Sequence, residues 1–484
     1  MHRASPLPHL FLLALITGCE SAPVVEEVVL TNASESLEAV LEHGELVGAC
    51  DRYWAHEAEG SATRRELLLC GKEMFFYEDF ETPGLPTALL RFYMEALPET
   101  VGPGMRGFGM HRDPYAADGR PLGFGDALSI GNARDVPTVA FTCASCHFGR
   151  APDGRYVVGL GNREYDYGAQ LVAISRFPVL NGNDLSMESP EVRRIVEPMV
   201  EEWNARSADD QRALFADLAA GLGSGLTVDP STRMSDAQAL AHASWGPGRL
   251  DALMFPNPVD DHVHAPTKIP NAFGLPTPEE MAAASPTGDP HLRIGWAGSA
   301  PSIEEFARGF IALGEGDPSG WIPARVAPLR AYLESLEPPT SPHREDEALI
   351  AEGRQLFDER GCAECHNAPG YASTAVYSFE EIGTDAALAS ILDASGSGVP
   401  TPNLTPDHPS LLTRGVKAPR LYGMWATTRF LHNGSVSSLE ALFCLESERP
   451  TIEAEPWSDG GHRETCDGLE DEEKRALIAF LRSL

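Results

Sequence analysis

The chain is short of basic residues. Its 484 residues include 37 Lys and Arg against 71 Asp and Glu, which gives a formal net charge of −34 at pH 7. Such a deficit of cations argues against a nucleic-acid-binding protein, because the phosphate backbone is bound mainly by Lys and Arg. The acidic charge favours solubility, and it suits either a positively charged partner protein or a solvated surface without a partner.

Long apolar runs are also missing. Beyond the N-terminal region no 18 consecutive residues are apolar, so no later segment is predicted to span a membrane. At the N-terminus, His2 and Arg3 precede an apolar run over residues 10–16, which is typical of a signal peptide and too short to span. Residues 15–19, Leu-Ile-Thr-Gly-Cys, resemble the lipobox of bacterial lipoproteins.

The lipobox resemblance implies that residues 1–19 are a lipoprotein signal peptide and that Cys19 is lipidated. Glu20 follows this cysteine, which by the same resemblance favours the outer membrane. Residues 20–45 are acidic and polar and contain proline, which predicts a flexible tether. We therefore expect a periplasm-facing outer-membrane lipoprotein that contacts the membrane only through its lipid.

Two short motifs carry the chemistry. Residues 361–366 read Gly-Cys-Ala-Glu-Cys-His, and residues 143–147 read Cys-Ala-Ser-Cys-His. Cys-x-x-Cys-His is the pattern of covalent c-type haem attachment, in which the thiols bond the haem and the histidine ligates its iron. The sequence therefore predicts two covalent haems. The residues expected to hold them are Cys143, Cys146, His147, Cys362, Cys365 and His366.

A zinc site and a thiol redox pair are the alternatives for these motifs. A zinc site needs a second closely spaced Cys/His pair, and neither copy has one nearby. A thiol redox motif follows a strand, whereas residues 347–360 before Cys362 have apolar residues at helical spacing. Gly361 is placed to end that helix. These observations favour haem attachment.

Nine cysteines are present. Lipidation of Cys19 and two haem motifs leave Cys50, Cys70, Cys444 and Cys466. In an oxidising compartment, four spare cysteines imply two disulfides. Proximity in the sequence favours pairing the first with the second and the third with the fourth, although four cysteines allow three pairings.

Strands are scarce and helices dominate the expected secondary structure. One short strand is expected over residues 154–159. Residues 337–342 are rich in proline and form the best candidate linker. We expect an N-terminal haem domain over residues 46–340 and a C-terminal domain over residues 341–484. Helices are expected over residues 85–97, 190–205, 209–222, 302–313, 323–336, 347–360 and 471–484.

Three further segments carry a family resemblance. They are Ile-Gly-Thr-Asp at 382–385, Lys-Ala-Pro-Arg-Leu-Tyr-Gly-Met-Trp-Ala-Thr at 417–427 and Phe-Leu-His-Asn-Gly-Ser-Val at 430–436. With the second haem motif they resemble the bacterial di-haem cytochrome c peroxidase superfamily. The di-haem rubber oxygenases are the most similar branch, because they also carry Gly-His, here at 461–462, before an acidic final helix. The similarity is good over residues 345–484 and weaker before them.

The resemblance implies a mostly helical protein with two cytochrome c-type haem domains, the C-terminal one similar to class I cytochromes c. It implies an open iron position at the His147 haem and two axial ligands at the His366 haem. His462 is then the first candidate for the distal ligand of the second haem, followed by His432 and Met424. The methionine ligand of the peroxidases is missing, since residues 414–416 read Arg-Gly-Val.

Two catalytic assignments also depend on this resemblance. Trp296 occupies the place of a tryptophan between the haems, where an aromatic ring shortens the tunnelling gap; a packed core indole is the alternative. Glu315 lies near the position of an acid that moves a proton during peroxide cleavage, or it is a solvent-facing helix end. His262 and His264 are further possible ligands, or solvent-facing loop residues.

The expected function is an exported di-haem oxidoreductase. Peroxide or dioxygen is activated at the His147 haem, and electrons pass through the His366 haem, supplied or taken by a basic redox partner. The alternative is an electron carrier in which both irons have two axial ligands. The chain is shorter than a rubber oxygenase, so the resemblance does not carry over an organic substrate.

Overall fold

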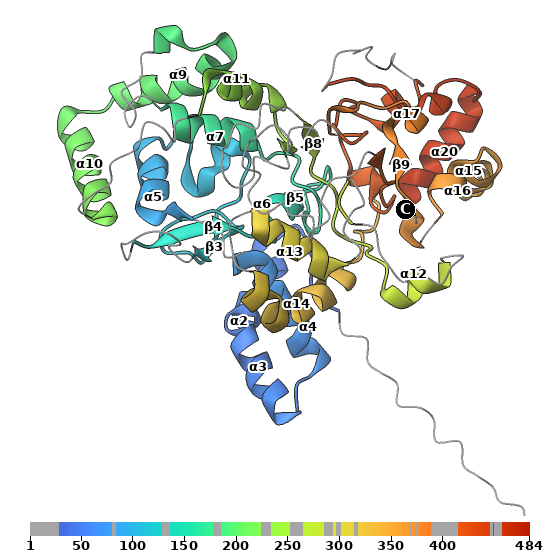
Figure 1. Ribbon diagram of the computed structural model, residues 1–484, viewed down its shortest axis with the longest axis horizontal. Helices are drawn as coiled ribbons and strands as arrows, with labels where there is room; N and C mark the ends of the chain where they lie inside the picture. The colour runs from blue at the N-terminus through green and yellow to red at the C-terminus, as the bar shows by residue number, and fades with distance from the viewer. Residues whose placement is uncertain are drawn as a thin grey trace, which may run out of the picture.

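The structure is a computed structural model, and it is mostly helical (Figure 1). The predictions for Cys19, His262, His264 and Glu315 lie outside the described residues. Within the part of the chain that is described, no helix is long and apolar enough to cross a membrane. The described residues are 29–79, 84–127, 136–177, 185–223, 234–251, 265–284, 294–296, 302–313, 318–367, 369–373, 375–388, 415–445, 449 and 457–484.

The first group of helices combines the beginning and the middle of the chain (Figure 1). Gly71 lets two of these helices approach closely, because a Cβ at this position would lie 2.1 Å from the carbonyl oxygen of Pro328. A disulfide between Cys50 and Cys70 ties two neighbouring helices together. The group contains α1 (Leu37–Leu41), α2 (His43–Leu46), α3 (Ala49–Glu59), α4 (Arg64–Tyr77), α13 (Ile303–Leu313) and α14 (Pro318–Glu334).

A second group packs around its own hydrophobic core, which includes Trp203 and Trp245. Ser207 caps the start of one of its helices, because its hydroxyl accepts a hydrogen bond from the Asp210 backbone. The helix expected over 85–97 begins two residues later, since residues 85 and 86 pair with a strand. The helices are α5 (Thr87–Ala96), α7 (Tyr167–Arg176), α9 (Pro190–Asn204), α10 (Ala208–Leu222) and α11 (Asp236–Trp245).

The C-terminal residues form the third group, at the right of Figure 1. Its core lies between α15 (Glu347–Glu359) and α20 (Asp471–Ser483), which pack closely against each other. Gly353 is required at their contact, because a Cβ there would lie 2.0 Å from the Ala476 carbonyl oxygen. The smaller helices are α16 (Cys362–Cys365), α17 (Phe379–Ile382) and α19 (Leu439–Leu442), and α12 (Pro278–Ala284) lies nearby.

Short antiparallel strands form four small sheets among the described residues. The predicted strand over 154–159 is present as β6, between β1 and β5. Two three-stranded sheets are β1 (Ala33–Ser34), β6 (Tyr156–Val158), β5 (Phe148–Arg150), and β2 (Leu85–Pro86), β4 (Thr138–Phe141), β3 (Phe124–Ala127). Two-stranded pairs are β7 (Arg249–Asp251) with β8 (Pro266–Lys268), and β9 (Tyr377–Ser378) with β10 (Gly415–Val416). The described 3₁₀ helices are η1 (Pro103–Phe108), η2 (Leu185–Met187), η4 (Pro369–Tyr371), η5 (Met424–Ala426) and η6 (Arg463–Thr465).

The proline-rich segment over 337–342 passes between the groups and is held by both. The Trp425 indole donates to the Pro339 carbonyl (3.0 Å), and the Arg155 guanidinium donates to the Thr340 carbonyl (2.7 Å). The helix before this segment was expected over 323–336. It begins five residues earlier, at Pro318, because proline is well suited to the first turn of a helix. Division into domains at this segment stays a prediction.

Candidate haem site

The second Cys-x-x-Cys-His motif follows the end of α15, as the sequence predicts. Gly361 has a left-handed backbone (φ 79°), which lets the chain turn directly into the short helix that holds both cysteines. The thiols of Cys362 and Cys365 are free, and both line a cavity of about 430 Å³. The motif therefore presents two unpaired thiols at the edge of one cavity.

His366 is fixed in this cavity by a backbone carbonyl. Its ring is 8% exposed, and Nδ1 donates to the Tyr371 carbonyl oxygen over 2.6 Å. Burial, with smaller contributions from the neighbouring His462 and Lys417, lowers the pKa of His366 to about 4. The imidazole is therefore neutral at physiological pH, and Nε2 is its available metal-binding atom.

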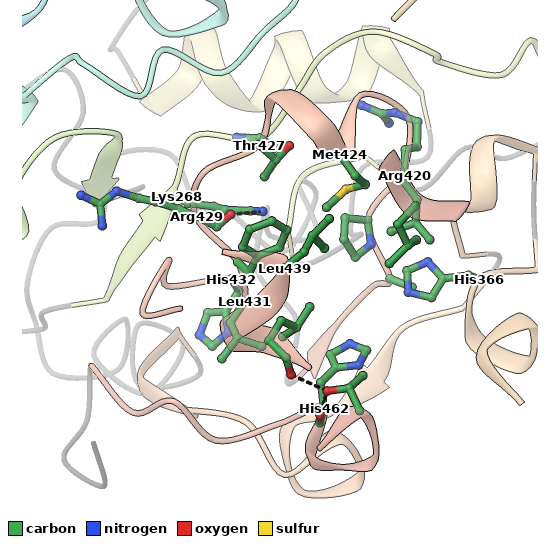
Figure 2. Close-up of a pocket in the computed structure, with 18 of the residues that line it drawn as sticks. Lys268, His366, Arg420, Met424, Thr427, Arg429, Leu431, His432, Leu439 and His462 are labelled. Carbon is green, nitrogen blue, oxygen red and sulfur yellow. Dashed lines mark hydrogen bonds between the residues drawn. The ribbon is translucent and has the colours of Figure 1, made fainter. Parts of the chain in front are cut away.

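His462 faces His366 across the cavity (Figure 2). The two ring centres are 6.4 Å apart and the ring planes are tilted by 35°. An iron held between two imidazoles, with metal–nitrogen bonds of about 2 Å each, separates the ring centres by roughly 6 Å. Nδ1 of His462 donates to the Glu464 carboxylate (3.1 Å), which again leaves Nε2 for a metal.

The loop that carries His462 is anchored at several points. The Arg449 guanidinium is buried and donates to the carbonyl oxygens of Asp459 (2.5 Å), Gly461 (2.6 Å) and His462 (3.3 Å). His462 itself has a left-handed backbone (φ 53°). A disulfide joins the cysteines at 444 and 466. These contacts hold the imidazole in place without help from a regular helix.

The other two candidate ligands occupy different positions. Both line the cavity, but His432 lies on the side away from His366 (Figure 2). The His432 carbonyl accepts a hydrogen bond from the Lys268 backbone (2.8 Å), and Nδ1 lies 3.4 Å from the Thr384 hydroxyl. His432 thus supports the surrounding turn.

The walls and donors of the cavity fit a c-type haem. Two thiols and two imidazoles are the donor set of a covalently attached haem with two axial ligands. Apolar side chains from several elements provide much of the remaining wall, as the haem ring requires. They include Leu421, Leu431, Leu439, Phe443, Leu477 and Leu481.

The first motif forms α6 (Cys143–His147) and uses the same anchoring device. Burial raises the pKa of the two thiols, Cys143 to about 12 and Cys146 to about 11, so both stay protonated. Nδ1 of His147 donates to the Pro270 carbonyl oxygen (2.9 Å), and burial lowers its pKa to about 4. A distant loop therefore orients this imidazole with Nε2 free, as at His366.

Trp296 lies in the wall of the cavity. Its indole N–H donates to the Lys268 carbonyl (2.9 Å), and the Lys268 amine lies 5.3 Å from the centre of the ring. The indole is half-buried and touches a small apolar cluster. Its position beside the haem cavity is compatible with a relay, and its catalytic role stays a prediction.

Three cations in this cavity were missed in the sequence. Burial lowers the pKa of Lys268 and of Lys417 to about 7, and that of Arg420 to about 10. A pair of cations within the apolar and proline-containing segment over 417–427 is the signal that points to Lys417 and Arg420, whereas Lys268 lies outside that segment. Nothing in the sequence reveals that these side chains face a cavity.

Two comparisons with known proteins give partial matches. A family model described as RoxA-like, cytochrome c-like matches residues 415–452. This C-terminal segment is cytochrome c-like. An uncharacterized protein, y4iM, of Sinorhizobium fredii (strain NBRC 101917 / NGR234) is 27% identical in an alignment over 169 residues that covers 28% of this chain and 37% of the relative. The matched part thus spans well under two thirds of that relative.

The matched segment implies a c-type cytochrome and a c-type haem. It contains His432 and Cys444, and the spacing of both Cys-x-x-Cys-His motifs is compatible with covalent attachment. The match ends before His462, so the facing imidazole is found from the structure and from the Gly-His pattern rather than from the family model.

Proposed function

We propose that the chain is an exported di-haem c-type cytochrome that acts as an oxidoreductase. The pair of imidazoles at 6.4 Å, beside two free thiols in one cavity, is the observation that carries this proposal. Cys362 and Cys365 attach the haem, and His366 and His462 hold its iron. Cys143, Cys146 and His147 attach a second haem.

The two haems have different tasks. When bound, a haem with two imidazole ligands transfers electrons, and one with an open position binds peroxide or dioxygen. We assign electron transfer to the His366 site, and activation of peroxide or dioxygen to the His147 site. Trp296 relays electrons in this scheme, and Glu315 moves a proton. The rubber-oxygenase resemblance supports the scheme.

The proposal also includes the location of the protein, its domains and its redox partner. Lipidation of Cys19 places the protein at the periplasmic side of the outer membrane, with residues 20–45 as a tether. The N-terminal haem domain covers residues 46–340 and the C-terminal cytochrome c domain covers residues 341–484. Export suits a c-type cytochrome, and the net charge of −34 suits a basic redox partner.

An electron carrier without a substrate is the second candidate. The His366–His462 pair is common to both candidates, because two imidazoles leave no position on that iron for a substrate, so the candidates differ at the His147 haem. The absorption and EPR spectra of the ferric protein separate the candidates. A high-spin component supports the oxidoreductase, and two low-spin haems support the carrier.

Haem attachment is tested by the mass of the mature chain. We expect two added haem masses that survive acid-acetone extraction, because thioether bonds are covalent. Replacing Cys143 and Cys146 by Ala should remove one haem, and replacing Cys362 and Cys365 by Ala should remove the other. A mature chain that carries one haem or none would overturn the di-haem proposal.

A further inference from the structure

The cavity beside His366 has a surplus of cations in an acidic chain. Its wall includes six Lys and Arg but only two carboxylates, whereas the whole chain has 71 Asp and Glu against 37 Lys and Arg. Both carboxylates are engaged locally, Glu464 with His462 and Glu381 with the backbone of Ser378. The six cations are Arg163, Lys268, Arg360, Lys417, Arg420 and Arg429.

Lys417 is the one buried residue among these six cations. Its side chain is 93% buried and lines the cavity, and no described residue forms a hydrogen bond or ion pair with its amine. Other enclosed lysines are paired: Lys72 with Glu42 (2.7 Å), and Lys268 with the Arg429 carbonyl (2.8 Å). A lysine amine that faces an enclosed cavity without a protein partner favours an anion as the occupant of that cavity.

Arg420 adds a second charge at the same place. Its guanidinium donates to the carbonyl oxygens of Asn271 (2.9 Å) and Phe273 (3.1 Å), which fix it within the cavity wall (Figure 2). It lies close enough to lower the pKa of Lys417, and no carboxylate contributes to the pKa of either group. An arginine cannot lose its proton, so this charge persists. Two like charges are thus held together without a counter-ion among the described residues.

We propose that Lys417, beside Arg420, is a carboxylate-binding site, and that its occupant is a propionate of the haem attached at Cys362 and Cys365. The inference rests on the proposed function. It goes beyond that function because it assigns a residue that binds a propionate at the acidic edge of the haem. Haem carries two propionates, so its charge matches the two cations. A charge-assisted hydrogen bond to an ammonium is the strong form of such an anchor.

The test uses the haem-loaded protein and the variant Lys417→Met. The midpoint potential of the low-spin haem should fall, because an unpaired propionate stabilises ferric iron, and the equilibrium constant for reduction should drop by about tenfold. Lys417→Arg should retain the wild-type potential. Lys474→Met is the matched control, since Lys474 is 94% buried but has Asp471 at 3.9 Å; it should leave the potential unchanged.

Acetate distinguishes the two sources of a carboxylate. No spectral change when acetate is added to the wild type, together with the lower potential of Lys417→Met, supports the propionate. A saturable change that Lys417→Met abolishes would assign the site to an exchangeable carboxylate and overturn the propionate. An unchanged potential with no acetate response would overturn the site itself.

A second variant and a calorimetric titration cover the cases in which Lys417→Met does not fold or the chain carries no haem. Where Lys417→Met fails to fold, Lys417→Gln, which keeps a polar end group, takes its place in the same measurements. A mature chain without haem overturns the proposed function, and calorimetric titration of acetate into the wild type and Lys417→Gln then decides the carboxylate site. Equal heats for both proteins would refute it.

Discussion

One hydrogen bond at Nδ1 orients each candidate iron ligand. His147 donates to Pro270, and His366 donates to Tyr371, both through backbone carbonyls. His462 uses the Glu464 carboxylate instead, which fixes the orientation of its ring. The common arrangement leaves Nε2 free in each case. The haem motif therefore predicts which histidine is a ligand, but it does not predict which hydrogen-bond acceptor orients that histidine.

Removal of the His462 ring should alter one haem selectively. In His462→Gly, we expect one low-spin haem to become high-spin and its reduction potential to rise, because a strong donor to ferric iron is lost. The backbone should tolerate this change, since His462 has φ 53° and glycine adopts that conformation freely. The ferric EPR spectrum and a redox titration measure both effects.

His432 provides the control for this experiment. The side chain is 5% exposed and supports a turn, so His432→Gln should lower the midpoint of thermal unfolding without a clean spin conversion. An unaltered low-spin spectrum in His462→Gly would instead move the ligand to His432 or Met424. It would also weaken the resemblance to the rubber oxygenases.

Sites whose chemistry fixes both the residue types and their spacing were predictable from the sequence. Two cysteines and a histidine at fixed spacing point to haem, and the observed disulfides join the cysteines that lie nearest in sequence, Cys50 to Cys70 and Cys444 to Cys466. Lys417 was not predictable as an anion site. A lysine is normally solvated, and its burial here depends on packing that local sequence does not encode.

At the scale of the elements, the periodicity of apolar residues predicts that a helix exists better than it predicts where that helix begins and ends. Helices near 190–205 and 209–222 are present, with Ser207 as the cap between them. The sequence predicts a helix from residue 85, because Pro86 suits a first turn, yet the backbone of residues 85 and 86 pairs with residues 138 and 139 in a sheet. Pairing with a strand about fifty residues away is not visible in a local pattern.

The contact between α15 and α20 gives a prediction for helix packing. Gly353→Ala should destabilise the protein by ~1–3 kcal/mol, because a Cβ would lie 2.0 Å from the Ala476 carbonyl oxygen. Alanine normally stabilises a helix relative to glycine by ~1 kcal/mol, so the sign is reversed here. Chemical denaturation followed by circular dichroism measures this difference.

Gly44→Ala is the matched control for that substitution. Gly44 lies in α2, and a Cβ there would meet nothing within 4 Å. The variant should therefore be as stable as the wild type or slightly more stable. Equal destabilisation by both substitutions would show that close packing of α15 on α20 is not what requires Gly353.

At the scale of the whole molecule, the loop over 270–273 connects the two haem motifs. Its Pro270 carbonyl orients His147, and the carbonyls of Asn271 and Phe273 hold Arg420, which lies in the wall of the His366 cavity. The loop belongs to the middle of the chain, far in sequence from both motifs. Such a junction cannot be read from composition or periodicity, because it exists only after the helical groups have packed.

The charge of the whole molecule gives the last prediction. With a net charge of −34, the protein should associate rapidly with a basic electron donor at low ionic strength. The association rate constant should fall by about tenfold or more between 0.01 M and 0.15 M salt, because the Debye length shrinks from about 30 Å to about 8 Å. Stopped-flow reduction of the haems by a small basic cytochrome measures this rate. An acidic donor is the control and should react faster as salt is added. A rate that does not depend on salt with either donor would mean that the acidic residues serve solvation alone.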